Sequence, residues 1–265
     1  MICNNKRGLC EMKKYVLKGV VVFIIICFIF GCMSLKTHIG VNDNFKNNAL
    51  TYTKDYKIGA ENFVFLLKEV VPLICLEEEC EPKIDSTASG FVFSSDENSI
   101  FVMTAAHFCA ESESLDIFLS QNIIGFANDT PRQLYLLYMD KEKDLCMLHG
   151  VKNLNENFGN IKIAKEPTIG ERVYTVAAPE GIAGPGIRLI FDGIFSGCDE
   201  LYCMSTIPAT FGSSGAGIYN KKGELISVVM AVPQSFSHVV ISPSHKDLIK
   251  FIKIIDDKVD IYPYR

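Results

Sequence analysis

The sequence lacks the motifs by which many zinc sites and nucleic-acid-binding surfaces are found. No two cysteines have the CxxC spacing, no HExxH occurs, and the five histidines are scattered along the 265 residues. A metal site is therefore not expected, and no cofactor is implied. Lysine and arginine form no dense cluster, and the formal net charge is −5. This charge argues against a phosphate backbone as partner, so nucleic acid is not expected to bind.

Internal repeats are absent and helical periodicity is scarce. From about Glu61 onward, short apolar runs rich in Val, Ile, Phe and Tyr alternate with Gly, Pro, Asn and Asp. A dozen or more strands at this spacing favour barrels or sandwiches over alternating strands and helices. We expect an all-β domain in two six-stranded halves, at about 66–150 and 160–243.

One helix is predicted at the end of the domain, over residues 244–256. Ser244 is a suitable N-cap, and Leu248, Phe251 and Ile252 fall on one helical face.

The N-terminal segment has the pattern of an export signal. The lysines of MKKYVLK precede an uninterrupted apolar stretch from Gly19 to Phe30, and Gly31 and Cys32 follow. Residues 29–32 resemble a bacterial lipobox, in which the cysteine receives lipid. An uncleaved single-span anchor is the alternative. We expect residues 1–32 to be a signal peptide or membrane anchor, with the domain exported and attached to the membrane.

The next segment, residues 33–60, is polar and rich in Asn, Lys and Thr, and we expect a tether there. The globular domain would then occupy residues 61–265. Six cysteines remain in it: Cys75, Cys80, Cys109, Cys146, Cys198 and Cys203. An even number in an oxidising compartment is compatible with three disulfides. CLEEEC and CDELYC share one spacing, which leaves Cys109 and Cys146 as the third pair; six free thiols are the alternative.

The stretch FGSSGAG, residues 211–217, is a turn or the site of a nucleophilic serine. A serine needs a base to take its proton and donors to stabilise the oxyanion that it creates. Gly212 precedes Ser214 by two residues, so their two amides could converge on one carbonyl oxygen.

Two further residues are candidates to assist such a serine. His107 directly follows the apolar run SIFVM and the small residues of TAA, and Asp144 stands between the charged loop DKEKD and the run LCMLHG. A half-buried carboxylate there could orient the imidazole. The alternatives are a structural histidine and an aspartate that only caps a strand.

The chain order His107, Asp144, Ser214 and the motifs around these residues resemble the trypsin-fold (chymotrypsin-like) serine proteases. TAAH, DLCML and GSSGAG are similar to the histidine, acid and nucleophile motifs of that family, and the resemblance extends over about 66–256. IGERVYTVAAPEG and DGIFSG resemble segments of the bacterial Deg-type branch. The resemblance implies two six-stranded antiparallel β-barrels with the three residues in the cleft between them.

The resemblance also assigns roles. His107 would act as general base and then acid, Asp144 would orient it, and Ser214 would attack the scissile carbonyl. The amides of Gly212 and Ser214 would form the oxyanion hole. Ala216 replaces the second glycine after the nucleophile of the family motif, and this is the main departure of the loop.

The implied substrate is a protein or peptide. The walls of the S1 pocket would come from Pro208, Ala209, Thr210, Met230, Ala231 and Val232. None is charged, so small or medium apolar P1 side chains are expected; His238 could instead favour an acidic one. We expect a membrane-tethered serine endopeptidase that forms an acyl-enzyme, with a catalytically inactive protease-like binding module as the alternative.

Overall fold

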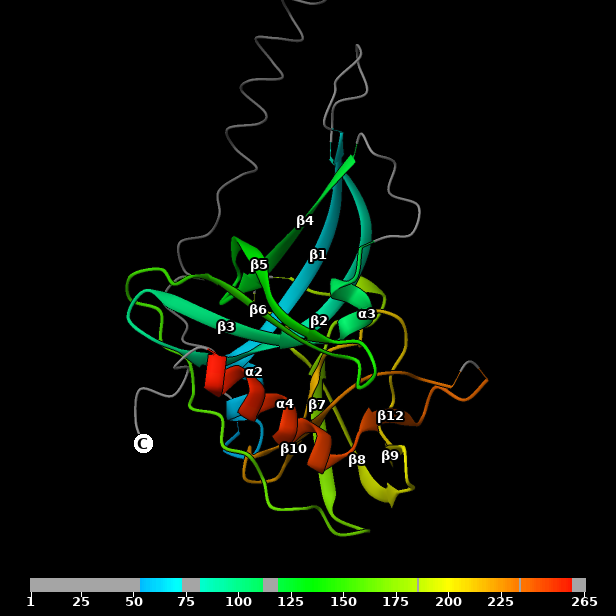
Figure 1. Ribbon diagram of the computed structural model, residues 1–265. Helices are drawn as coiled ribbons and strands as arrows, with labels where there is room; N and C mark the ends of the chain where they lie inside the picture. Colours follow the sequence, from blue (N-terminus) through cyan, green and yellow to red (C-terminus); the bar gives the residue numbers. More distant parts are fainter. Residues whose placement is uncertain (1–52, 73–81, 112–118, 185, 234, 259–265) are drawn as a thin grey trace, which may run out of the picture. The chain divides into compact units, whose positions relative to one another are not determined.

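Six antiparallel strands in the first half of the domain close into a barrel (Figure 1). They are β1 (Phe63–Pro72), β2 (Lys83–Ser95), β3 (Ser99–Thr104), β4 (Leu119–Ala127), β5 (Thr130–Asp140) and β6 (Leu145–Val151), and the order around the barrel is β1-β2-β3-β6-β5-β4. The computed structural model describes residues 53–72, 82–111, 119–184, 186–233 and 235–258. The predicted signal or anchor (1–32), most of the predicted tether, and Cys75 and Cys80 lie outside the described residues.

Strand β3 shows why several apolar runs lack the alternation of a half-exposed strand. Ile100 and Val102 point into the first barrel, whereas Phe101 and Met103 belong to a core shared with the second half of the chain. Both faces of the strand are therefore buried, and both must be apolar.

The second half forms a six-stranded antiparallel sheet. Its strands are β7 (Arg172–Ala177), β8 (Leu189–Cys198), β9 (Tyr202–Ser205), β10 (Gly217–Asn220), β11 (Leu225–Val228) and β12 (Val240–Pro243), in the order β11-β10-β7-β8-β9-β12. The prediction of two six-stranded halves is confirmed. The second is barrel-like but differs from the first: in the described residues β11 and β12 form no ladder, and an isolated bridge between Ala231 and Ile241 connects this end of the sheet to the segment after β11.

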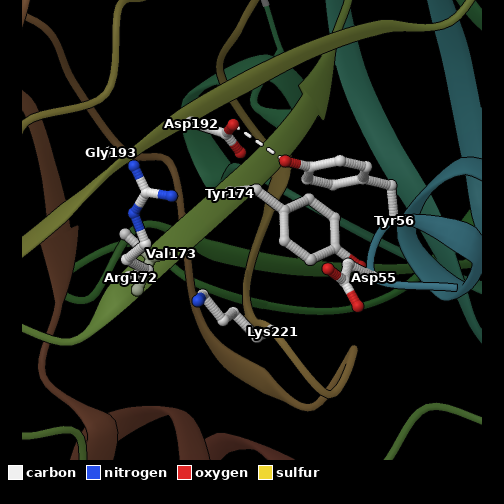
Figure 2. Close-up of a pocket in the computed structure, with 8 residues that line it drawn as sticks. All are labelled: Asp55, Tyr56, Arg172, Val173, Tyr174, Asp192, Gly193 and Lys221. Carbon is white, nitrogen blue, oxygen red and sulfur yellow. Dashed lines mark hydrogen bonds between the residues drawn. The ribbon is translucent and has the colours of Figure 1, made fainter. Parts of the chain in front are cut away.

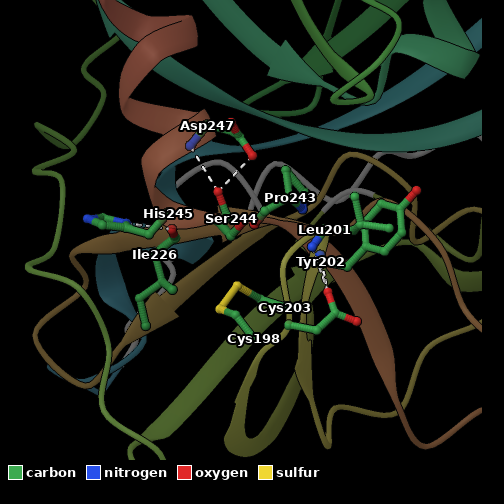
Figure 3. Close-up of a disulfide and its surroundings, with 11 residues drawn as sticks. Cys198, Leu201, Tyr202, Cys203, Ile226, Pro243, Ser244, His245 and Asp247 are labelled. Carbon is green, nitrogen blue, oxygen red and sulfur yellow. Dashed lines mark hydrogen bonds between the residues drawn. A yellow bond between two sulfur atoms is a disulfide. The ribbon is translucent and has the colours of Figure 1, made fainter.

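Helix α4 (His245–Lys258) follows the last strand, as predicted. The Ser244 hydroxyl accepts a hydrogen bond from the Asp247 amide at 3.1 Å and donates one to the Asp247 carboxylate at 2.7 Å (Figure 3). Leu248, Phe251 and Ile255 are buried in the shared core between the two halves. The apolar face of the helix thus closes that core.

The folded domain begins earlier than residue 61. Helix α2 (Lys57–Asn62) precedes β1, and its Gly59 and Ala60 are buried. The Tyr56 hydroxyl donates to Asp192 on β8 at 2.8 Å, beside the Tyr174 ring (Figure 2). The folded domain therefore begins before the predicted tether boundary at residue 60. Helix α2 can pack closely against Tyr174 because residue 59 is glycine: a Cβ on Gly59 would lie 2.8 Å from the Tyr174 ring.

Two of the predicted disulfides are present, and the alternative of free thiols is wrong for these four cysteines. Cys198 and Cys203 join β8 to β9 (Figure 3), and Cys109 and Cys146 join the segment after β3 to β6. Among the described residues, no helix has both the length and the apolar character needed to cross a membrane.

Candidate active site

His107 and Asp144 are in direct contact at the ends of two paired strands. His107 lies in α3 (Ala106–Cys109), a single turn after β3, and Asp144 immediately precedes β6. The register of β3 and β6 brings these two ends together. Asp144 Oδ2 lies 2.8 Å from His107 Nδ1, and its Oδ1 accepts the His107 backbone amide at 2.7 Å. The carboxylate therefore fixes both the main chain and the ring of the histidine.

Asp144 adopts a backbone conformation that is rare for an aspartate, with φ of 53°. Short polar side chains tolerate this left-handed region better than other residues do. The side chain of Asp144 is 14% exposed and that of His107 is 52% exposed. One edge of the imidazole is thus held by the carboxylate, while the ring remains accessible to solvent.

The loop that carries Ser214 is held by its carbonyl groups. The Phe211 carbonyl accepts a hydrogen bond from the Glu180 amide at 2.6 Å, and the Gly212 carbonyl accepts one from the Ser89 hydroxyl at 2.7 Å. Glu180 belongs to η2 (Pro179–Gly181) in the second half of the chain, whereas Ser89 is on β2 of the first barrel. Both halves therefore fix the loop.

The next two carbonyls of the loop are also paired. The Ser213 carbonyl accepts the Ala216 amide at 3.2 Å, and the Ser214 carbonyl accepts the Ser89 amide at 2.9 Å. A planar trans peptide points its N–H away from its C=O. Pairing four successive carbonyls thus also fixes the directions of the four amides that follow them.

The amides of Gly212 and Ser214, which flank Ser213, have no hydrogen-bond acceptor among the described residues. The Ser213 and Gly215 amides donate to backbone carbonyls, whereas within the described part of the chain the Gly212 and Ser214 amides donate to none. Gly212 and Ser214 also line one cleft. Two unpaired N–H donors beside a hydroxyl can donate hydrogen bonds to a developing oxyanion and so stabilise it.

Two glycines allow the loop to take this course. Gly212 and Gly215 have φ of 86° and 85°, a region that other residues rarely adopt. A Cβ on Gly215 would also collide with the Ser89 carbonyl and the Thr104 hydroxyl of the first barrel. Glycine at 215 therefore permits the close approach of the two halves next to Ser214.

Ser89 is a residue of the site that the sequence pattern did not predict. Its hydroxyl accepts the Ala178 amide at 2.9 Å while donating to Gly212, and its carbonyl accepts the Thr104 hydroxyl at 2.7 Å. The serine is fully buried. A serine directly before an apolar strand core is the only local signal, since its partners are remote in the sequence.

A cleft with a volume of about 500 Å³ brings the predicted residues together. His107, Gly212 and Ser214 line it, and the further lining residues are Lys68, Asp85, Ser86, Thr87, Ala88, Phe108, Glu180 and Phe211. Ser213 is fully buried in the loop, whereas Ser214 is partly exposed. Of the two serines, only Ser214 reaches the cleft.

A buried lysine lies at the first-barrel side of the cleft. Lys68 is 5% exposed, donates to the Ala110 carbonyl at 3.1 Å and lies 3.8 Å from the Asp85 carboxylate. Burial lowers the pKa of its ammonium group, and Asp85 opposes this effect. The Lys68 ammonium group therefore already has partners within the protein, the Ala110 carbonyl and the Asp85 carboxylate.

The predicted S1 residues do not line this cleft. Ala209 is buried in the core of the second half, Pro208 and Val232 are half-buried, and Met230 donates to the Ile241 carbonyl at 2.9 Å. Thr210 instead contacts Glu180, its hydroxyl donating to the carboxylate at 3.0 Å.

Two other predicted features concern a histidine and metals. His238 is exposed and packs edge-on against Phe236, with ring centroids 5.7 Å apart. No three His, Cys, Asp or Glu side chains in the described ranges are grouped as a metal site would require.

Comparison with known proteins agrees with this fold. The model of the trypsin-like peptidase domain matches residues 88–228, just over half of the chain, and this segment contains His107, Asp144 and Ser214. No match was found among curated proteins. The crystal structure of the serine endoprotease from Yersinia pestis superposes with a TM-score of 0.58 at 18% identity, covering 78% of this chain and 67% of that one. The chain therefore belongs to the family of trypsin-like peptidase domains.

Proposed function

We propose that the protein is a serine endopeptidase that cleaves proteins or peptides through His107, Asp144 and Ser214. The observation that carries the proposal is the shared cleft: the histidine, held by the aspartate, and the accessible serine come from opposite halves of the domain and line the same cavity.

The geometry supports a defined division of labour. Asp144 Oδ2 accepts a hydrogen bond from the protonated Nδ1 of His107. The unprotonated Nε2 is then free to accept the proton of the Ser214 hydroxyl. The Ser214 oxygen then bonds to the substrate carbonyl carbon, whose oxygen becomes negative. The unpaired Gly212 and Ser214 amides stabilise that oxygen. His107 returns the proton to the leaving amine, and water later hydrolyses the acyl-enzyme.

Labelling with a fluorophosphonate probe tests the proposal. We expect wild-type protein to be labelled on Ser214, Ser214→Ala to lose labelling, and Ser213→Ala to keep it because Ser213 is buried. Digestion of an unfolded protein substrate should follow the same order. A folded wild-type domain that is neither labelled nor active would instead favour the binding module that has lost catalysis.

We also propose that residues 1–32 export the domain and hold it at a membrane, either through lipid on Cys32 or as a single span. The support is the lysine-flanked apolar segment followed by Gly31 and Cys32. Incorporation of labelled palmitate should be lost in Cys32→Ser if the cysteine carries lipid. Membrane recovery without palmitate would indicate the single span, and a soluble full-length chain in the cell fraction would contradict both.

A further inference from the structure

An exposed aromatic ring and a carboxylate stand together at the rim of the cleft. Phe211 is 77% exposed although it is a large apolar side chain, and Glu180 is also exposed. The Glu180 amide donates to the Phe211 carbonyl at 2.6 Å, which fixes the two residues side by side. Both line the cleft together with Ser214. An exposed ring beside the nucleophile is available to substrate.

The position of Glu180 is defined by its main chain and by its carboxylate. Its φ is 53°, so the residue stands in a tight turn, and its Oε1 accepts the Thr210 hydroxyl at 3.0 Å. One carboxylate oxygen is thereby anchored. The other oxygen, Oε2, accepts no hydrogen bond from another described residue. It is therefore available to accept a hydrogen bond from a substrate.

Glu180 is also the charge in the cleft that has no counter-charge. Lys68 and Asp85 lie 3.8 Å apart, and His107 contacts Asp144. Across the ranges that the structure covers, no lysine, arginine or histidine pairs with Glu180. The carboxylate of Glu180 is therefore the unpaired charge that the lining of the cleft presents to a substrate. Lys68 is buried and already bonded to Ala110 and Asp85.

We propose that Phe211 and Glu180 form a subsite for an arginine or lysine side chain of the substrate. A guanidinium or ammonium group is attracted to the face of an aromatic ring and to a carboxylate at the same time. The arginine side chain fits best, because its planar group can stack on Phe211 while donating to Glu180. This inference rests on the proposed endopeptidase function.

The subsite belongs to the segment that leaves after the bond is cut. The cleft is walled by residues 85–88 and by His107, which must protonate the leaving amine and so lies on that side. The predicted S1 residues are not among its walls. The cationic side chain is therefore placed C-terminal to the scissile bond.

Matched peptides test the subsite. Internally quenched peptides built on one cleaved sequence would carry arginine or citrulline, its uncharged analogue, at each of the first three positions after the cut. We expect kcat/KM to be about three- to tenfold higher for arginine at one position, the range for an exposed cation–aromatic contact with an ion pair. The preference should shrink as salt is raised, because exposed charges are screened.

Two variants locate the preference. Glu180→Gln keeps an acceptor for Thr210 but removes the charge, so the arginine-to-citrulline ratio should fall; Phe211→Leu should also reduce it, and the two changes together should bring it to near one. Glu166→Gln removes the same charge from a site that does not line the cleft, and it should leave the ratio unchanged.

The outcomes separate the two proposals. A wild-type enzyme that cleaves arginine and citrulline peptides equally, or a ratio that persists in Glu180→Gln, overturns the subsite and leaves the endopeptidase intact. If the wild type cleaves nothing and Ser214 is not labelled, the endopeptidase proposal fails. The subsite is then decided by fluorescence anisotropy on Ser214→Ala of two fluorophore-labelled peptides that differ only in arginine or citrulline at one position: arginine should bind more tightly, and equal binding overturns it.

Discussion

Cys109 and Cys146 are bonded to each other, and each follows a residue of the candidate site by two positions. Cys109 comes two residues after His107, and Cys146 comes two residues after Asp144. The disulfide therefore joins the turn that carries the histidine to the strand that follows the aspartate. It links the same two segments as the His107–Asp144 contact.

Removing this disulfide should destabilise the domain and also impair the site. For a sequence separation of 37, the chain-entropy model gives about 4 kcal/mol, against about 2 kcal/mol for the separation of 5 between Cys198 and Cys203. Urea unfolding of the two double Cys→Ala variants measures the difference. Labelling of Ser214 should be slowed only in the 109/146 variant; equal slowing in both would contradict a link to the site.

Asp144→Asn should abolish most activity without unfolding the protein. The amide oxygen can still accept the His107 backbone amide, but the amide nitrogen would face Nδ1 and favour the tautomer that carries its proton on Nε2. The equivalent change in trypsin lowers kcat by about 10⁴-fold. Steady-state kinetics and a thermal melt measure the two effects. A variant that keeps full activity would rule Asp144 out as the residue that orients His107.

Ser89→Ala should weaken both the fold and the loop that carries Ser214. The Ala178 amide and the Gly212 carbonyl would lose the hydroxyl that joins them. An unpaired buried group costs about 1–3 kcal/mol. We expect a lower urea midpoint and a fall in kcat larger than the change in KM. Ser94→Ala is a suitable control, since its buried hydroxyl has no hydrogen-bond partner among the described residues and its loss should leave kcat unchanged.

Gly215→Ala should be far more damaging than Ala216→Gly. At residue 215 the positive φ and the collision with Ser89 and Thr104 both oppose a side chain, and such strain costs about 1–3 kcal/mol. Ala216→Gly restores the family motif and should cost about 1 kcal/mol or less. Urea unfolding and Ser214 labelling measure both changes. If Ala216→Gly instead raised the labelling rate severalfold, the alanine would be shown to disturb the proposed oxyanion site.

Asp247 should make the docking of α4 sensitive to acid. Burial favours a higher pKa for Asp247, but the Ser244 hydrogen bond and Lys143 outweigh it and hold the pKa below its usual value. The carboxylate of Asp247 therefore contributes its full stabilisation at pH values above its pKa in the unfolded chain, which is about 4. This contribution is lost as the pH falls through the lower pKa of the folded state.

Comparison of Asp247→Asn with wild type measures that contribution. The variant should be less stable than wild type at pH 6, and the difference should narrow as pH falls below about 4. Asp257→Asn, at an exposed position of the same helix, should show neither effect. A difference that stays constant with pH would mean that the charge of Asp247 does not stabilise the helix.

Local patterns were enough to predict much of this domain. The apolar run of β3 is buried on both faces, and Ser244 with Leu248 and Phe251 marked the helix, because strand and helix periodicity and capping depend on neighbours in the sequence. The motifs around His107, Asp144 and Ser214 were sufficient to identify the candidate residues. The position of Gly212, two residues before Ser214, was sufficient to single out the two amides that the structure leaves without a backbone acceptor in the described chain.

Other features depended on contacts between distant segments. The Ser89 hydroxyl bridges Ala178 and Gly212, which lie 89 and 123 residues away, and the Tyr56 hydroxyl pairs with Asp192 across 136 residues. The docking of helix α2, the bridge between Ala231 and Ile241 and the Glu180–Phe211 pair have the same origin. Residue types and their spacing in the sequence determined which hydrogen-bond donors and acceptors the chain carries. Only packing of the two halves decided which buried donors and acceptors had to meet, because each unpaired group would cost free energy.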